Sequence, residues 1–236
     1  MSRFITIKAG FQALEVRPQG PAKAGLVLIQ EIFGVNANIS ELAQHYASQG
    51  YHVVAPDLFW REEPLINLDP GAEADRTRAM ALNAAFDDEL GLSDLAACTQ
   101  CLRSMLAPHK PIFAVGYCMG GRLSFRLGSH NRVDASVSYY GVNIDQYLVN
   151  ADTGSPRLIH IAEKDALCPP EKQTVIVDWA KNAEAAVHIY EGATHAFARA
   201  HAQSYMEAAA ILANRRTLEF FEKCTAALNA EHGESE

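Results

Sequence analysis

Short apolar segments alternate with segments of helical spacing along most of this chain, and this alternation is its most constraining feature. The apolar runs are GLVLIQEIFG, YHVVAPD, PIFAVGYC, VDASVSYYG, RLIHIAEKD and AVHIYEG. Continuous runs of this length are typical of strands buried on both faces. Strands that alternate with helices form a mostly parallel sheet with helices on both faces, and ligands bind beyond the carboxyl ends of its strands. We therefore expect an α/β protein whose site lies at that edge.

Turn residues and helical spacing divide the rest of the chain. RFITIKAG and FQALEVRP predict an opening β-hairpin, and the proline-rich, acidic stretch at 61–71 predicts a loop over the top of the sheet. We expect helices at 38–50, 73–106, 119–129, 171–182 and 202–228, with a break near Gly91 and a frayed HGESE tail. No repeat or linker divides the sequence, so residues 1–236 are expected to form a single domain.

The composition narrows the class of partner. A net charge of −8 argues against nucleic acid or an anionic membrane as the main partner. The start MSRFITIKAGF lacks the pattern of a secretory signal, and no apolar run is long enough to span a bilayer. The five cysteines leave one over in any pairing, which favours a reducing cytosol over a disulfide framework. We expect a cytoplasmic protein, monomeric or weakly homo-oligomeric, that acts on a small molecule.

The segment Gly116-Tyr117-Cys118-Met119-Gly120-Gly121 carries the strongest chemical signal. It follows the apolar run PIFAV and opens a predicted helix, which is the context of a nucleophile elbow with cysteine as the nucleophile. Small residues on either side let the nucleophile occupy a sharp, strained turn. The N–H groups at the start of the helix favour a thiolate or an oxyanion. The alternative is a small buried cysteine beside an ordinary tight turn.

An acid and a base follow the cysteine in the order that the α/β-hydrolase fold requires. Asp165 follows the run RLIHIAEK, and His195 lies in the loop GATHAFAR after the next predicted strand. Taken alone, the aspartate could be a helix cap and the histidine a surface residue. The ordered set predicts a triad of Cys118, Asp165 and His195 in an α/β-hydrolase fold.

The sequence resembles the dienelactone hydrolases (carboxymethylenebutenolidases) over nearly its whole length. The landmarks are QEIFGVN at 30–36, APDLF at 55–59, AFDDELGLSDL at 85–95, GYCMGG at 116–121, YYGV at 139–142 and THAFAR at 194–199. The family's triad falls on the three residues already chosen. The resemblance implies that dienelactone is opened to maleylacetate, a step in the degradation of chlorinated aromatic compounds.

The resemblance also implies roles for groups near the elbow. The family's additional carboxylate falls on Glu31, which would contact the resting thiol and take its proton when substrate binds. Such control would protect the thiol from oxidation. The alternative is a partly buried glutamate satisfied by loop N–H groups. The backbone N–H groups of Ile32 and Met119 would form the oxyanion hole.

Family substrates are anionic, and the family's two carboxylate-binding arginines fall on Arg76 and Arg199. Arginine forks suit carboxylates, although both side chains could instead be solvated. Tyr139 matches a family tyrosine near the site, or it is a core aromatic. The chain departs from the family at Met80 and Asn83, where a tyrosine and a tryptophan are typical, and we expect both residues to line the pocket and to change the ring contacts to the lactone.

Other signals do not support a different chemistry. Cys98 and Cys101 have redox or zinc spacing, but they lie in a predicted helix without a second ligand pair. Nothing indicates a metal site or an organic cofactor. We therefore expect a hydrolase of a small anionic lactone that uses a cysteine acyl-enzyme. The alternatives are a related hydrolase of another ester or lactone, and a thiol redox protein or non-catalytic binding module with the same fold.

Overall fold

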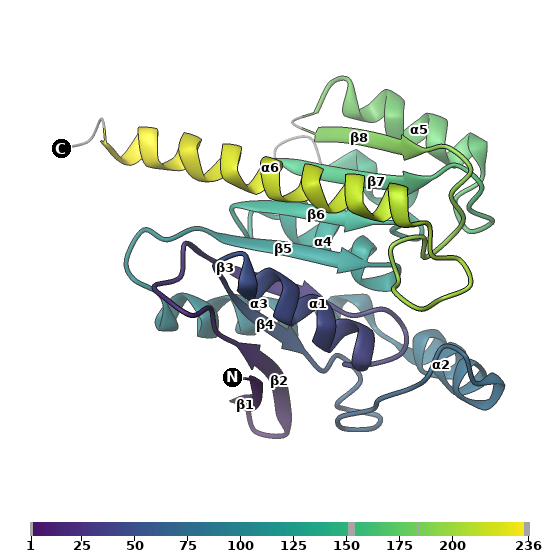
Figure 1. Cartoon of the computed structure of the whole chain (residues 1–236), viewed down its shortest axis with the longest axis horizontal. Helices are drawn as coiled ribbons and strands as arrows, with labels where there is room; N and C mark the ends of the chain where they lie inside the picture. Colours follow the sequence, from purple (N-terminus) through teal and green to yellow (C-terminus); the bar gives the residue numbers. More distant parts are fainter. Residues whose placement is uncertain (1, 151–153, 184, 234–236) are drawn as a thin grey trace.

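The computed structural model describes residues 2–150, 154–183 and 185–233, which contain one sheet of eight strands (Figure 1). The strands are β1 (Ser2–Lys8), β2 (Phe11–Val16), β3 (Ala24–Ile29), β4 (Tyr51–Pro56), β5 (Ile112–Tyr117), β6 (Ala135–Tyr139), β7 (Arg157–Ala162) and β8 (Ala185–Tyr190). Their spatial order is β1-β2-β4-β3-β5-β6-β7-β8. The first two neighbouring pairs, β1–β2 and β2–β4, are antiparallel, and all later pairs are parallel. The structure confirms the predicted hairpin and the mostly parallel sheet.

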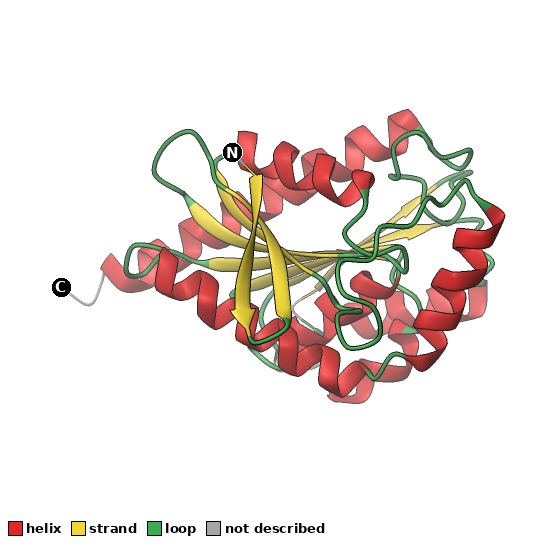
Figure 2. Ribbon diagram, turned by 90° about the horizontal axis from the view of Figure 1, so that it is seen from below, coloured by secondary structure: helices red, strands yellow, loops and turns green. Residues whose placement is uncertain are grey.

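Helices cover both faces of this sheet (Figure 2). They are α1 (Ala37–Ser48), α2 (Glu73–Ala85), α3 (Asp88–Met105), α4 (Met119–Ser129), α5 (Pro170–Ala180) and α6 (Glu207–Gly233), with a short 3-10 helix η1 (Ile144–Asn150). Side chains of α1 and α6 share one core with the sheet, and α2, α3 and α4 share another on the opposite face. α5 and η1 pack beside α4. This is the α/β-hydrolase architecture that the sequence predicts.

The register of the parallel strands determines which loops meet. Ile29, the last residue of β3, pairs with Gly116 of β5, and Tyr117 pairs with Tyr139, the last residue of β6. The loops after these strands therefore begin side by side at the carboxyl edge of the sheet. The loops after β3 and β5 carry Glu31, Ile32 and Cys118, and Met119 follows at the start of α4.

The predicted helical break near Gly91 is wrong, because the interruption lies between α2 and α3 at Phe86 and Asp87. The Asp87 carboxylate caps α3 by accepting the backbone N–H groups of Glu89 and Leu90 at 2.8 and 3.1 Å. Gly91 lies inside α3, where a Cβ atom would be 2.4 Å from the Phe86 ring. The glycine makes room for an aromatic ring and does not end a helix.

The last helix begins later than predicted, at Glu207 and not near residue 202. The segment before it forms turns, in which the Met206 N–H donates to the Phe197 carbonyl at 2.9 Å and His201 has a φ of 62°. The helix continues to Gly233. The expected fraying of the tail falls mainly on residues 234–236, which lie outside the described residues.

Candidate active site

Cys118 occupies the one-residue turn between β5 and α4, with φ 56° and ψ −114°. A Cβ atom on Gly116 would lie 1.9 Å from the Gly120 carbonyl oxygen, and one on Gly120 would lie 2.4 Å from the Ile29 carbonyl oxygen. Both positions therefore require glycine, as the elbow pattern predicts. The turn places the cysteine side chain, which is 7% exposed, at the carboxyl edge of the sheet.

Asp165 and His195 meet at this edge from two different loops. The His195 Nδ1 and Asp165 Oδ2 atoms are 2.8 Å apart. The other carboxylate oxygen of Asp165 accepts the Leu167 N–H at 2.9 Å, and the carboxylate is 1% exposed. Asp165 lies in the turn beyond Ala162, where β7 ends. A buried, fully bonded carboxylate of this kind fixes the orientation of the imidazole.

The second ring nitrogen of His195 faces the other way. Nε2 is buried and makes no hydrogen bond with any described residue. Burial lowers the pKa of His195, but the hydrogen bond with Asp165 and the interaction with the neighbouring Cys118 outweigh it and raise the pKa to about 10. The structure therefore brings together the cysteine, histidine and aspartate that the sequence selects as a triad.

Glu31 is bound at both carboxylate oxygens by Arg199. Arg199 Nε donates to Oε2 at 2.8 Å, and Nη2 donates to Oε1 at 2.9 Å. No hydrogen bond joins Glu31 to Cys118 among the described residues. The guanidinium also lies over the Phe33 ring, 5.1 Å from its centroid. Burial lowers the pKa of Arg199, but the charge of Glu31 outweighs it and raises the pKa.

The backbone N–H groups of Ile32 and Met119 lie beyond the paired ends of β3 and β5. Met119 is the first residue of α4, so its N–H has no partner within the helix. Neither N–H donates to a described residue. Both donors are therefore available to an oxygen atom at the site.

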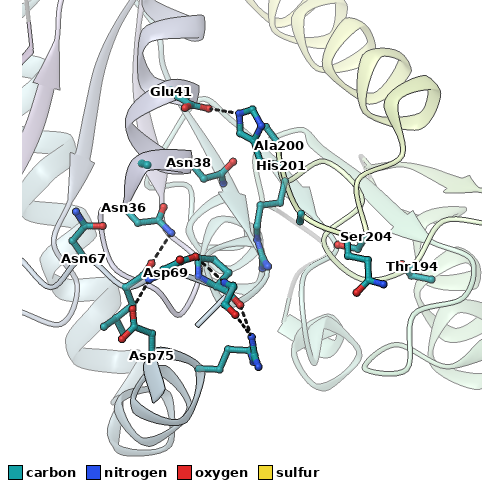
Figure 3. Close-up of a pocket in the computed structure, with 18 residues that line it drawn as sticks. Asn36, Asn38, Glu41, Asn67, Asp69, Asp75, Thr194, Ala200, His201 and Ser204 are labelled. Atoms are coloured by element: carbon teal, nitrogen blue, oxygen red, sulfur yellow. Dashed lines mark hydrogen bonds and ion pairs between the residues drawn. The ribbon is translucent and has the colours of Figure 1, made fainter. Parts of the chain in front are cut away.

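A cavity of about 840 Å³ is lined by Arg199 and by Thr194, the residue before His195, whereas Cys118, Asp165, His195 and Glu31 are not among its described lining residues (Figure 3). Its walls are the start of α1, the loop at 67–71, the start of α2, Thr194 and the segment 199–204. Arg76 and Arg199 both line it, as the sequence predicts for an anion site. Arg76 is anchored by donating to the carbonyl oxygens of Pro70 and Gly71 at 3.0 and 2.8 Å. Across the opening, Glu41 and His201 lie 3.8 Å apart.

The two adjacent tyrosines of YYG point in different directions. The Tyr139 hydroxyl lies in the core, 2.9 Å from Asn214 Oδ1 and 2.8 Å from Thr217 Oγ1 of α6. The Tyr140 ring lies 5.2 Å from the His195 ring, and its buried hydroxyl has no hydrogen-bond partner among the described residues. Burial raises the pKa of Tyr140, with a further contribution from the charge of Glu31. The structure therefore places the side chain of Tyr140, and not that of Tyr139, beside the triad.

The remaining sequence candidates lie elsewhere. Neither Met80, which is exposed, nor Asn83 is among the described side chains that line the cavity. Cys98 and Cys101 are free thiols in α3, and burial raises the pKa of each. No described group of three or more His, Cys, Asp or Glu side chains could hold a metal ion. None of the described helices is both long and apolar enough to cross a membrane.

The chain matches the dienelactone hydrolase family over residues 11–225. It is 40% identical to a carboxymethylenebutenolidase of Pseudomonas putida over 85% of this chain and 87% of that one. A second carboxymethylenebutenolidase, from Cupriavidus pinatubonensis, is 34% identical over 91% of this chain and 93% of that one. Among solved structures, a provisionally named dienelactone hydrolase of Klebsiella pneumoniae superposes with a TM-score of 0.83 at 26% identity, covering 94% and 98% of the two chains.

Proposed function

Because this chain belongs to the dienelactone hydrolase family and is a hydrolase of that kind, we propose that it opens a small anionic lactone through a thioester on Cys118. The substrate we propose is dienelactone and the product maleylacetate. The observation that carries the proposal is the arrangement of Cys118 on the elbow with the hydrogen-bonded pair of Asp165 and His195. The Nε2 atom of His195 has no hydrogen-bond partner among the described residues.

The proposed reaction has two stages. The Cys118 sulfur bonds to the lactone carbonyl carbon, and the carbonyl oxygen becomes an oxyanion held by the Ile32 and Met119 N–H groups. The ring C–O bond then breaks, and the ring oxygen leaves with a proton from His195 as an enol that tautomerises. In the second stage His195 takes a proton from water, whose oxygen attacks the thioester. The C–S bond breaks and releases the acid, and the Cys118 thiolate takes back the proton that Glu31 accepted before the attack.

The Arg199–Glu31 pair supports an anionic substrate. A substrate carboxylate that enters the cavity competes with Glu31 for the same guanidinium. A displaced Glu31 carboxylate is a base able to take the proton of the Cys118 thiol. Attack would then begin only when a substrate of the right charge is bound. Arg76, on the opposite wall, would supply the second positive charge.

The cavity also favours a second candidate, hydrolysis of a bulkier polar ester or lactone. A cavity of about 840 Å³ lies near the upper end of the range for small-molecule sites. Its walls include the polar side chains of Asn38, Asn67 and Gln203. Such a lining suits a substrate with several oxygen atoms beyond its carboxylate.

Assays of the purified protein test both candidates. Hydrolysis of cis- and trans-dienelactone would be compared with that of p-nitrophenyl acetate and of larger hydroxylated lactones. Cys118→Ala is expected to lower kcat at least about a hundredfold, as for loss of a covalent nucleophile. Cys101→Ala, which removes a free thiol from α3, is the matched control. Iodoacetamide should label Cys118 before the other cysteines, and full activity after replacement of Cys118 would reject the mechanism.

A further inference from the structure

Gln30 is a fully buried residue between β3 and Glu31, and it has both ends of its amide bonded. Its Nε2 donates to the Glu31 carbonyl oxygen at 3.2 Å, and its Oε1 accepts the Leu58 N–H at 3.1 Å. A glutamine at this position loses hydration and side-chain freedom on folding. Both bonds are therefore needed to offset a cost that an apolar residue would not incur.

The Glu31 carbonyl and the Ile32 N–H belong to one peptide unit. A trans peptide is planar, and its C=O and N–H bonds point in opposite directions. A hydrogen bond that holds the carbonyl therefore also sets the direction of the N–H. We propose that Gln30 is a positioning residue that aims the Ile32 N–H into the oxyanion hole; this rests on the proposed function.

The loop that donates to the Gln30 side chain is itself held by hydrogen bonds. Leu58 follows β4, and the carboxylate of Asp57 accepts the N–H groups of Phe59 and Leu65 at 3.2 and 2.6 Å. Burial raises the pKa of Asp57, whose hydrogen bonds with the described residues all come from backbone N–H groups. The Gln30 amide thus connects the Glu31–Ile32 peptide to the backbone of a loop that is held by its own hydrogen bonds.

The second donor of the oxyanion hole is placed by a different contact. Gly120, at the start of α4, lies so close to β3 that a Cβ atom would be 2.4 Å from the Ile29 carbonyl oxygen and 2.5 Å from that of Gln30. This backbone contact sets how near Met119 lies to the end of β3. It does not set the rotation of the Glu31–Ile32 peptide plane, which is the contribution of the Gln30 amide.

Two substitutions test this role. Gln30→Met keeps the size of the side chain and removes both hydrogen bonds. Gln30→Glu keeps an acceptor for the Leu58 N–H, but only its protonated form can donate to the Glu31 carbonyl. We expect Gln30→Met to lower kcat roughly tenfold to a hundredfold, the scale of a misplaced catalytic group. KM should change little, and dienelactone and p-nitrophenyl acetate should lose rate equally, because both form an oxyanion.

The pH profile separates positioning from stability. Relative to Gln30→Met, the activity of Gln30→Glu should rise as the pH falls, because protonation restores the bond to the carbonyl. Thr217→Val is the matched control, since it removes a buried hydroxyl bonded to Tyr139 and His160. This control should lower the thermal midpoint while leaving kcat unchanged.

Several results would overturn the proposal. These are a kcat of Gln30→Met equal to that of wild type, or a loss confined to KM or to one substrate. If Gln30→Met does not fold, the pH profile of Gln30→Glu becomes the test. Wild-type activity of Gln30→Glu at every pH would reject the positioning role of Gln30. Absence of turnover by the wild-type enzyme, or turnover without Cys118, would instead reject the proposed function, and the positioning role with it.

Discussion

Arg199 donates hydrogen bonds to both carboxylate oxygens of Glu31, and the two side chains are 15% and 1% exposed, respectively. A buried ion pair of this kind is costly to break unless another ion replaces one partner. An anionic substrate can do so by occupying the guanidinium. In the mechanism that we propose, the pair would therefore link recognition of charge to release of a base that activates Cys118.

Replacing Glu31 by glutamine tests that link. Glu31→Gln is expected to lower kcat about a hundredfold or more, the range for loss of a general base, while KM changes less. The rate at which iodoacetamide alkylates Cys118 would be measured against pH, with and without a non-hydrolysable anionic analogue. In the wild type the analogue should change this rate, and in Glu31→Gln it should not. Identical profiles and an unchanged kcat would make Glu31 a structural residue.

The two arginines should separate anionic from neutral substrates. Arg199→Ala and Arg76→Ala are each expected to reduce kcat/KM for a carboxylate-bearing lactone roughly tenfold to a hundredfold, the scale of a lost charge-assisted hydrogen bond. A neutral ester should be nearly unaffected by Arg76→Ala. Arg78→Ala, on the same helix but paired with Glu63, is the control. Equal losses for both substrates would mean that these arginines do not recognise charge.

Stability should depend on pH through His195. Its pKa is about 10 in the folded protein, above the ordinary value of 6.5. A raised pKa stabilises the fold fully below the unfolded value, and the contribution is lost as the pH rises through about 10. The midpoint of urea unfolding of His195→Ala should fall furthest below that of wild type near about pH 6 and approach it near about pH 10. Curves separated by a constant amount at all pH values would contradict this assignment.

The neighbouring tyrosines make a matched pair of tests. Tyr140→Phe removes a buried hydroxyl that has no partner among the described residues, so stability should be unchanged or higher. Tyr139→Phe breaks contacts with Asn214 and Thr217 and should cost about 1 kcal/mol of unfolding free energy. Only Tyr140→Phe should alter kcat/KM. The opposite pattern in the kinetic assays would return the site role to Tyr139.

The sequence by itself determined the features that depend on neighbours along the chain. Apolar runs and helical spacing predicted the sheet and its covering helices, because burial on both faces and amphipathic packing require those patterns. The glycines of GYCMGG predicted the elbow for a steric reason, and Gly116 and Gly120 have no room for a Cβ atom. The order of cysteine, aspartate and histidine followed from the connectivity of the fold.

Patterns along the chain misled where the packing of a ring or the facing of a strand decided the outcome. Gly91 was expected to break a helix, but it accommodates Phe86 inside α3. Tyr139 was expected at the site, but successive side chains of a strand face opposite sides, and this one meets α6.

Only the tertiary structure decided which polar groups meet across the site. Glu31 and Arg199 are 168 residues apart, and no spacing along the chain indicates that they form an ion pair. The bond between Gln30 and the Leu58 N–H likewise depends on how the loops after β3 and β4 approach each other. Local patterns specify backbone conformation through sterics and burial within a few residues. Side-chain pairing depends on distances between elements, which are settled only when the sheet and helices pack together.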